Sequence, residues 1–140
     1  MITITSDPID LCKILAEAKD RSAGGTTLFI GSVRDHNEKE RIYEIYYEAY
    51  ENMVEQNLAE VENEARERWN IQRFVAVHRI GNLMVGDISV AVAVSAEHRK
   101  EAFEACKYGI DAIKMRAPIW KKEVSDSGGG WVEGFPLDSD

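Results

Sequence analysis

The sequence predicts one α+β domain whose sheet is largely antiparallel, with the element order β-α-β-β-α-β-β-α-β-β. Three observations support this fold class. Strand-like runs occur in pairs between single helical runs, an arrangement typical of α+β proteins. The 140 residues suit one domain with one core. No internal repeat, low-complexity segment or linker divides the chain, so we treat residues 1–140 as a single domain.

The first two predicted strands flank a short helix. Residues 2–5 form a run of apolar and β-branched side chains. Ser6 is predicted to cap the following helix, which has Pro8 near its first turn and extends to about Lys19. Residues 26–33 are again rich in β-branched and apolar side chains, which predicts the second strand.

The middle of the chain begins with a polar loop. Residues 34–41 form a polar run too long for a tight hairpin turn, so they predict a mobile loop. Residues 42–50 contain four tyrosines and form the next predicted strand. Residues 51–69 predict a helix because apolar residues recur at spacings of three and four, at Val54, Leu58, Val61 and Ala65.

Two strands separated by a turn follow. Residues 71–80 predict a strand, residues 81–86 a turn, and residues 88–95 the strand with the clearest alternation. One face of that last strand carries the aliphatic residues Ile88, Val90, Val92 and Val94. Its other face is small, with Ser89, Ala91, Ala93 and Ser95. The small face predicts close packing by a helix or another backbone.

The last third contains the longest predicted helix. It covers residues 97–117, and Pro118 ends it. Its predicted buried stripe consists of Phe103, Cys106, Ile110, Ile113 and Ala117. Beyond it we expect a strand, a flexible turn, a last strand and a weakly ordered tail, at residues 119–124, 127–130, 131–133 and 134–140.

Charge and hydropathy narrow the function classes. The net charge of −8 argues against general nucleic-acid binding. Residues 98–122 nevertheless hold seven basic and three acidic side chains, so this basic island is +4 and the remainder −12. Such an island fits either a small anionic ligand or a solvated surface. The sequence has no apolar run long enough to cross a membrane and no secretory signal, so we expect a cytoplasmic protein.

Neither the cysteines nor the histidines form a known motif. Cys12 and Cys106 lie far apart and belong to no Cys-x-x-Cys pair, so we expect two small buried residues without a disulfide. His36 and His78 lack the spacing of a metal site. No Gly-rich phosphate loop is present. We therefore expect neither a metal nor another cofactor.

Lys114 is the first candidate for chemistry. Lys100, Lys107 and Lys114 recur every seven residues along one edge of the apolar stripe, Lys114 closest to its centre. The alternative is that these lysines have only a structural role. Their stems would then pack at the edge of the core, and their ammonium groups would pair with Asp111. Lys114 differs because it lies near three further cations, Arg116, Lys121 and Lys122. Crowded like charges disfavour the protonated ammonium, which suits a base or a nucleophile.

Two further groups could bind an anion. His98 and Arg99 open the long helix, where free backbone N–H groups favour negative charge. The alternative is that both are surface residues near a helix cap. Arg34 follows a strand and could reach into a cleft, although one arginine alone is weak support.

Several segments resemble the large, catalytic subunit family of molybdopterin synthase. They are GSVRDHN at 31–37, YEAY at 47–50, HRIG at 78–81, VSAEHR at 94–99, APIWKKE at 117–123 and WVE at 131–133. The resemblance covers about residues 25–133, in order and with short gaps. It implies the hammerhead-like α+β fold of that family. The chain ends soon after the last segment, so contacts that some members make through a longer basic tail are not expected here.

The resemblance implies a reaction and its partners. A small ubiquitin-like subunit carries a thiocarboxylate on its Gly-Gly tail, which enters a pocket of the large subunit. Two sulfur transfers convert cyclic pyranopterin monophosphate to molybdopterin and open the cyclic phosphate. The family works as a homodimer of large subunits with one small subunit at each end, a heterotetramer. The family pocket can draw residues from both large subunits.

The resemblance also implies residue roles. It places the family's essential lysine at Lys114 and a second active-site lysine at Lys121. We expect Lys114 to transfer protons or to bond transiently with the partner's carboxyl carbon, and Lys121 to stabilise negative charge. The implied substrate contacts and pocket residues also include Ser32, Val33, Arg34, His98, Arg99, Lys122 and Glu123. The rival functions are a non-catalytic phosphate- or nucleotide-binding module and a scaffold that docks a ubiquitin-like tail without chemistry.

Overall fold

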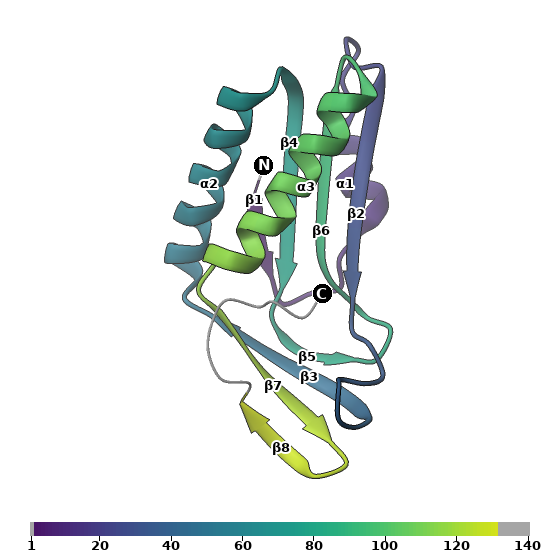
Figure 1. Cartoon of the computed structure of the whole chain (residues 1–140), viewed down its shortest axis with the longest axis vertical. Coiled ribbons are helices and arrows are strands. Elements are labelled where there is room, and N and C mark those ends of the chain that lie inside the picture. Colours follow the sequence, from purple (N-terminus) through teal and green to yellow (C-terminus); the bar gives the residue numbers. More distant parts are fainter. Residues whose placement is uncertain (1, 132–140) are drawn as a thin grey trace.

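The computed structural model describes residues 2–131 and confirms the α+β class (Figure 1). Within these residues the elements are β1 (Ile2–Thr5), α1 (Leu11–Ala18), β2 (Gly25–Ser32), β3 (Ile42–Ala49), α2 (Glu51–Arg68), β4 (Ile71–Arg79), β5 (Gly81–Met84), β6 (Ile88–Ala96), α3 (Arg99–Arg116), β7 (Ile119–Ser125) and β8 (Gly128–Trp131). No helix of the described chain is long and apolar enough to span a bilayer.

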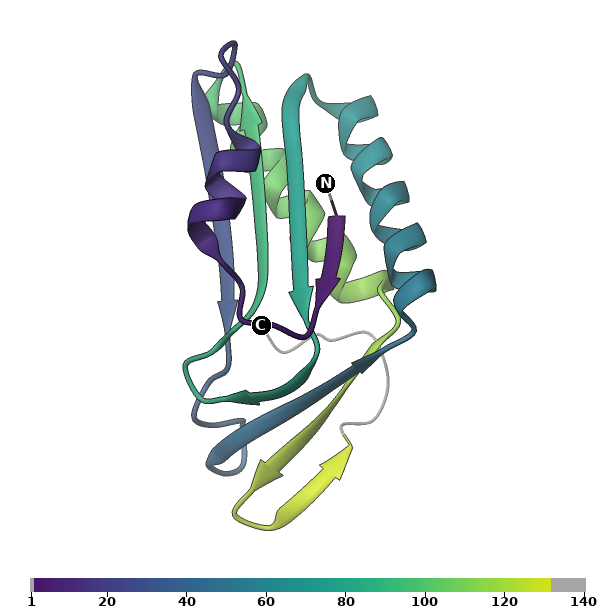
Figure 2. The same cartoon turned by 180° about the vertical axis from the view of Figure 1, so that it is seen from behind.

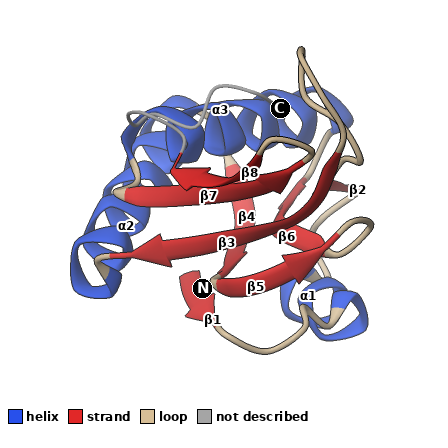
Figure 3. Cartoon of the chain, turned by 90° about the horizontal axis from the view of Figure 1, so that it is seen from below, coloured by secondary structure: helices blue, strands red, loops and turns tan. Residues whose placement is uncertain are grey.

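The strands divide between two sheets rather than one. The main sheet has the order β1-β4-β6-β2, and the second sheet has the order β5-β3-β7-β8. β1 and β4 are parallel, whereas the other neighbouring strands pair antiparallel, in line with the predicted pairing. Figure 3 shows the second sheet crossing the lower end of the main sheet. In Figure 1 the chain passes from one sheet to the other at this end.

Helices cover both faces of the main sheet. α2 and α3 lie on one face and α1 lies on the other (Figures 1 and 2). The small face of β6 packs against α1, where Ala91 and Ala93 contact the cluster around Ile14 and Ala18. The predicted close packing on that face is confirmed. α3 also approaches closely, because a Cβ on Gly109 would lie 2.9 Å from the Phe74 ring.

Two helix predictions need correction. α1 begins at Leu11, not after Ser6, because the Asp10 carboxylate caps it by accepting the Lys13 N–H at 3.2 Å. Ser6 and Pro8 belong to the turn after β1. In α3 the residues Cys106, Ile110, Ile113 and Ala117 are buried as predicted, but Phe103 is 62% exposed. Phe103 lies beside β2 at the edge of the sheet, where no other helix or strand of residues 2–131 covers it.

Two predicted turns contain strands. The segment predicted as a turn at 81–86 contains β5, which pairs with β3, and the chain reverses at Gly81 and Gly86 with φ of +93° and +91°. Similarly, β8 begins at Gly128 and pairs with β7 inside the predicted flexible turn. Short strands of this kind are specified by a distant partner rather than by their own residues. Residues 132–133 of the last predicted strand and the tail 134–140 lie outside the described residues.

Candidate active site

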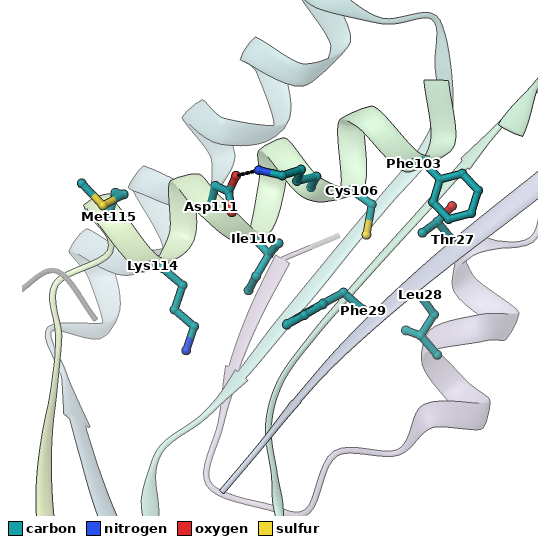
Figure 4. Close-up of a pocket in the computed structure, with 10 residues that line it drawn as sticks. Thr27, Leu28, Phe29, Phe103, Cys106, Ile110, Asp111, Lys114 and Met115 are labelled. Atoms are coloured by element: carbon teal, nitrogen blue, oxygen red, sulfur yellow. Dashed lines mark hydrogen bonds and ion pairs between the residues drawn. The ribbon is translucent and has the colours of Figure 1, made fainter. Parts of the chain in front are cut away.

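An open, mostly apolar groove runs between α3 and β2, with a volume of about 640 Å³. Leu28 and Phe29 of β2 form one wall, while Phe103, Ile110 and Met115 of α3 contribute to the other. Figure 4 shows these side chains around the groove. β2 is an edge strand of the main sheet, so its outer backbone edge borders the groove. A groove of this shape fits an extended, largely apolar segment.

Lys114 is the buried cation of this groove. It lies in the last turn of α3 and only 8% of its surface is exposed. In Figure 4 its side chain extends toward the lower end of the groove, away from Asp111. Lys107 itself is exposed and bonds Asp111 at 2.6 Å, as its surface role predicts. Lys114 is therefore in the groove wall, whereas the sequence placed it at the edge of the stripe.

Arg116 does not crowd Lys114. Its guanidinium turns to α2 and makes a two-point contact with Glu64, at 2.6 and 3.0 Å. This pairing and the Tyr108 hydroxyl lower the pKa of Glu64 to about 2. The carboxylate is thus charged throughout the neutral range, and it holds Arg116 there. Arg116 is therefore not part of the predicted cluster of positive charge around Lys114, because Glu64, 52 positions away in the sequence, neutralises it.

The groove also contains a thiol. Cys106 is buried and its Sγ donates to the Val92 carbonyl at 3.5 Å. Burial raises the pKa of this thiol to about 11, so it stays protonated near neutral pH and is a poor nucleophile. Cys12 is exposed, which corrects the prediction that both cysteines are buried, because it lies on the outer face of α1. Neither cysteine is disulfide-bonded.

A second, smaller hollow lies where β2 ends against β3 and β7. It brings together five of the predicted residues, Ser32, Val33, Arg34, Lys121 and Glu123. Lys121 is 7% exposed, and its Nζ lies 4.0 Å from an oxygen of Glu123. Lys114 at the end of α3 and Lys121 in β7 are therefore both buried. Burial of an ammonium costs free energy unless polar groups compensate it. Buried charged side chains of this kind are typical of functional positions.

The loop at 34–41, which was predicted to be mobile, makes hydrogen bonds to residues far away in the sequence. The Glu40 carboxylate accepts hydrogen bonds from the hydroxyls of Ser125 and Ser127 at 2.7 and 2.8 Å. Ile42 N–H donates to the Asp35 carbonyl at 2.8 Å. These contacts fix the loop to the β7–β8 turn, and with it Arg34 at the hollow. The sequence could not show this because the partners lie about 85 positions away.

Three predicted residues lie away from both hollows. Lys122 follows Lys121 in a strand and so points to the opposite face, where its stem lies 3.3 Å from a Cβ position on Gly129. His98 is the N-cap of α3 and Arg99 its first residue, and both are exposed. From Arg99 to Lys114 the helix rises about 22 Å at 1.5 Å per residue. His98 and Arg99 therefore do not share a site with Lys114 within one chain.

Other residues of the site were not expected from the sequence. Tyr47 is 3% exposed and lines the smaller hollow, with its ring packed edge-on against His78 at 5.1 Å. Its alternation with exposed neighbours along β3 was the available signal. No pattern in the sequence marked Phe29 and Met115 as residues of the groove. Within residues 2–131 no set of three or more His, Cys, Asp or Glu side chains is placed to hold a metal.

Comparison with known families shows the family and supports the fold. The family model described as MoaE protein matches residues 4–116 of the chain. This chain belongs to the MoaE protein family. Its MoaE relatives include the molybdopterin synthase catalytic subunits of Pyrococcus abyssi and Bacillus subtilis, each 43% identical. The alignments cover 86% and 92% of this chain and 81% and 82% of those relatives.

Solved structures agree with the MoaE assignment. Molybdopterin synthase from Staphylococcus aureus superposes with a TM-score of 0.89 at 37% identity, covering 94% of this chain and 96% of that one. A Helicobacter pylori complex of subunits 1 and 2 of molybdopterin-converting factor has a TM-score of 0.78 at 22% identity, covering 94% and 90%. The latter similarity shows the fold alone.

Proposed function

We propose that this chain is the catalytic subunit of a molybdopterin synthase. It accepts sulfur from the thiocarboxylated C-terminus of a small ubiquitin-like partner and transfers it to cyclic pyranopterin monophosphate. The carrying observation is that Lys114, buried at 8% exposure, lies in an apolar groove whose only lining thiol is held protonated. Such a groove suits an extended tail that brings its own sulfur. Family membership supports an enzyme of molybdopterin synthesis, and the sulfur donor is our inference.

We assign different steps of the reaction to the groove and to the smaller hollow. The partner's tail lies between β2 and α3 with its terminal thiocarboxylate near Lys114. Lys114 transfers protons or bonds transiently with the carboxyl carbon, and Lys121 stabilises negative charge as the phosphate ring opens. In each transfer a carbon–sulfur bond forms on the pterin side chain and a carbon–oxygen bond there breaks, once with opening of the cyclic phosphate and once with loss of water. The thiocarboxylate carbon–sulfur bond breaks at the same time as the sulfur leaves the partner. Water supplies the oxygen that restores the partner's carboxylate, and two partners deliver the two sulfurs.

The separation of the basic residues fits a site shared with a second copy of the chain. His98 and Arg99 lie at one end of α3, about 22 Å from Lys114 at the other. We propose that they contact the substrate phosphate in the site of the neighbouring subunit, within a homodimer that carries one small partner at each end. The exposed side chain of His98, at 74%, is then available to that neighbour. A scaffold without chemistry would need neither this arrangement nor buried lysines.

Reconstitution tests the proposal. The chain alone, supplied with cyclic pterin and free sulfide, is expected to form no dithiolene product at a useful rate. Adding the thiocarboxylated small partner is expected to produce it. The same partner ending in an ordinary carboxylate is the control and gives no product. Equal rates with free sulfide and with the partner would show that the sulfur source is misassigned.

Replacing both cysteines with serine is expected to leave turnover nearly unchanged. Cys12 is exposed, so its substitution costs little, whereas Cys106→Ser adds a polar group to the core and costs about 1–3 kcal/mol. The comparison is made at a temperature where thermal denaturation shows both proteins folded. A stably folded Cys12→Ser/Cys106→Ser variant without turnover contradicts sulfur delivery by the partner alone.

A further inference from the structure

Asn37 folds the loop that carries Arg34. Its Oδ1 accepts the backbone N–H groups of Lys39 and Glu40 at 2.8 and 2.9 Å, and its own N–H donates to the Glu40 carbonyl at 2.9 Å. These bonds fix the orientation of the side chain. The carboxamide N–H₂ is left facing strand β7.

The amide of Asn37 reaches the active-site strand. Its Nδ2 donates to Oε1 of Glu123 at 3.3 Å, across 86 positions in the sequence. The other oxygen of Glu123 lies 4.0 Å from Nζ of Lys121, and the two side chains are 18% and 8% exposed. Asn37, Glu123 and Lys121 therefore form one chain of polar contacts from the loop to the buried ammonium.

We propose that Asn37 is a positioning residue for Lys121 and acts through Glu123. The inference rests on the proposed function, in which Lys121 stabilises negative charge on the substrate. At 4.0 Å the carboxylate is beyond hydrogen-bond distance of the ammonium. The bond from Asn37 keeps one oxygen of Glu123 turned to the loop and prevents the carboxylate from closing on Lys121. A closed ion pair would weaken the stabilisation that the same ammonium gives to the negative charge that develops as the phosphate ring opens.

Asn37→Asp isolates this contact. Aspartate keeps the Oδ1 acceptor that folds the loop, loses the N–H donor, and faces Glu123 with a second carboxylate. Glu123 is then driven toward Lys121. We expect kcat to fall about tenfold, the effect of losing one charge-assisted hydrogen bond, while the KM for the pterin and the partner affinity stay unchanged. Asn63→Asp, exposed on α2, adds the same charge as a matched control and is expected to be silent.

The double variant Asn37→Asp/Glu123→Gln restores the contact with donor and acceptor exchanged. Glutamine donates to the new aspartate and presents its carbonyl oxygen to Lys121. We expect kcat to return to within about threefold of the native value, whereas Glu123→Gln alone stays low because an amide N–H₂ can then face the ammonium. A double variant no better than the single variants, or Asn37→Asp equal to Asn63→Asp, overturns the proposal.

Acetylation of Lys121 gives a readout that does not depend on turnover. Acetic anhydride is applied to the full chain, and the rate at Lys121 is compared with that at Lys107 by mass spectrometry of peptides. A closed ion pair with Glu123 would add to the contacts that the native amine already makes, so Asn37→Asp is expected to slow acetylation of Lys121 about threefold, with recovery in the double variant. An unchanged rate overturns the proposal. If the native chain makes no pterin product while these rates shift as expected, only the proposed function fails.

Discussion

Lys114→Ala is expected to lower turnover by about 10²–10⁴-fold, the usual contribution of a positioned proton-transfer group. Lys114 is the buried cation of the groove in which we place the partner's thiocarboxylate. The groove is open to solvent, so truncation widens it instead of leaving a closed cavity. Circular dichroism and binding of the small partner are expected to remain close to native. Turnover is measured as product formed per minute with saturating partner and pterin.

Two further substitutions separate chemistry from charge. Lys114→Arg keeps a cation but is not expected to rescue, because guanidinium stays protonated and serves neither as base nor as nucleophile. Lys107→Ala is the matched control, since Lys107 lines the same groove but is exposed and paired with Asp111. A mild and equal loss of turnover in Lys114→Ala and Lys107→Ala would mean that the basic island only attracts anions through its overall positive charge. The catalytic role assigned to Lys114 would then be wrong.

Heterodimers of two inactive chains are expected to recover about half of the native activity, because one of the two symmetric sites is then complete. The chains carry Lys114→Ala and Arg99→Ala, are co-expressed with different tags, and are purified by both. The expectation follows from the length of α3, which places Arg99 about 22 Å from Lys114 of the same chain. In our proposal Arg99 serves the site of the neighbouring copy.

The pair Lys114→Ala and Lys121→Ala provides the control for this experiment. We assign both lysines to the site of their own subunit, so each site in that heterodimer lacks one lysine and activity is expected to stay absent. Recovery in this control, or no recovery with Arg99→Ala, contradicts a site shared between copies. Subunit exchange during the assay is checked by repeating the two-tag purification afterwards.

The sequence predicted those features that local pattern determines. Alternation along β6 separated the valines that face α3 from Ala91 and Ala93, which face α1. The period of α2 located its buried residues, all four of which are confirmed at Val54, Leu58, Val61 and Ala65. These patterns succeed because side-chain direction follows from backbone geometry within one element.

Features that depend on distant partners were missed. β5 is four residues long and exists through its pairing with β3, so its own residues read as a turn. Sequence proximity predicted Arg116 beside Lys114, whereas its guanidinium pairs with Glu64 of α2. Likewise, the loop at 34–41 is held by Glu40 and Asn37 through contacts to β7 and its following turn. Such contacts join positions that no local pattern connects.

Sulfur isotope transfer tests the central proposal most directly. The small partner is prepared with ³⁴S in its C-terminal thiocarboxylate and mixed with the chain and unlabelled cyclic pterin, in the presence of ordinary free sulfide. Mass spectrometry then counts labelled sulfur in the pterin product. We expect both dithiolene sulfurs to carry the label, with the partner recovered as its carboxylate. Product that contains unlabelled sulfur, or labelled partner that survives while product forms, would contradict sulfur transfer from the partner.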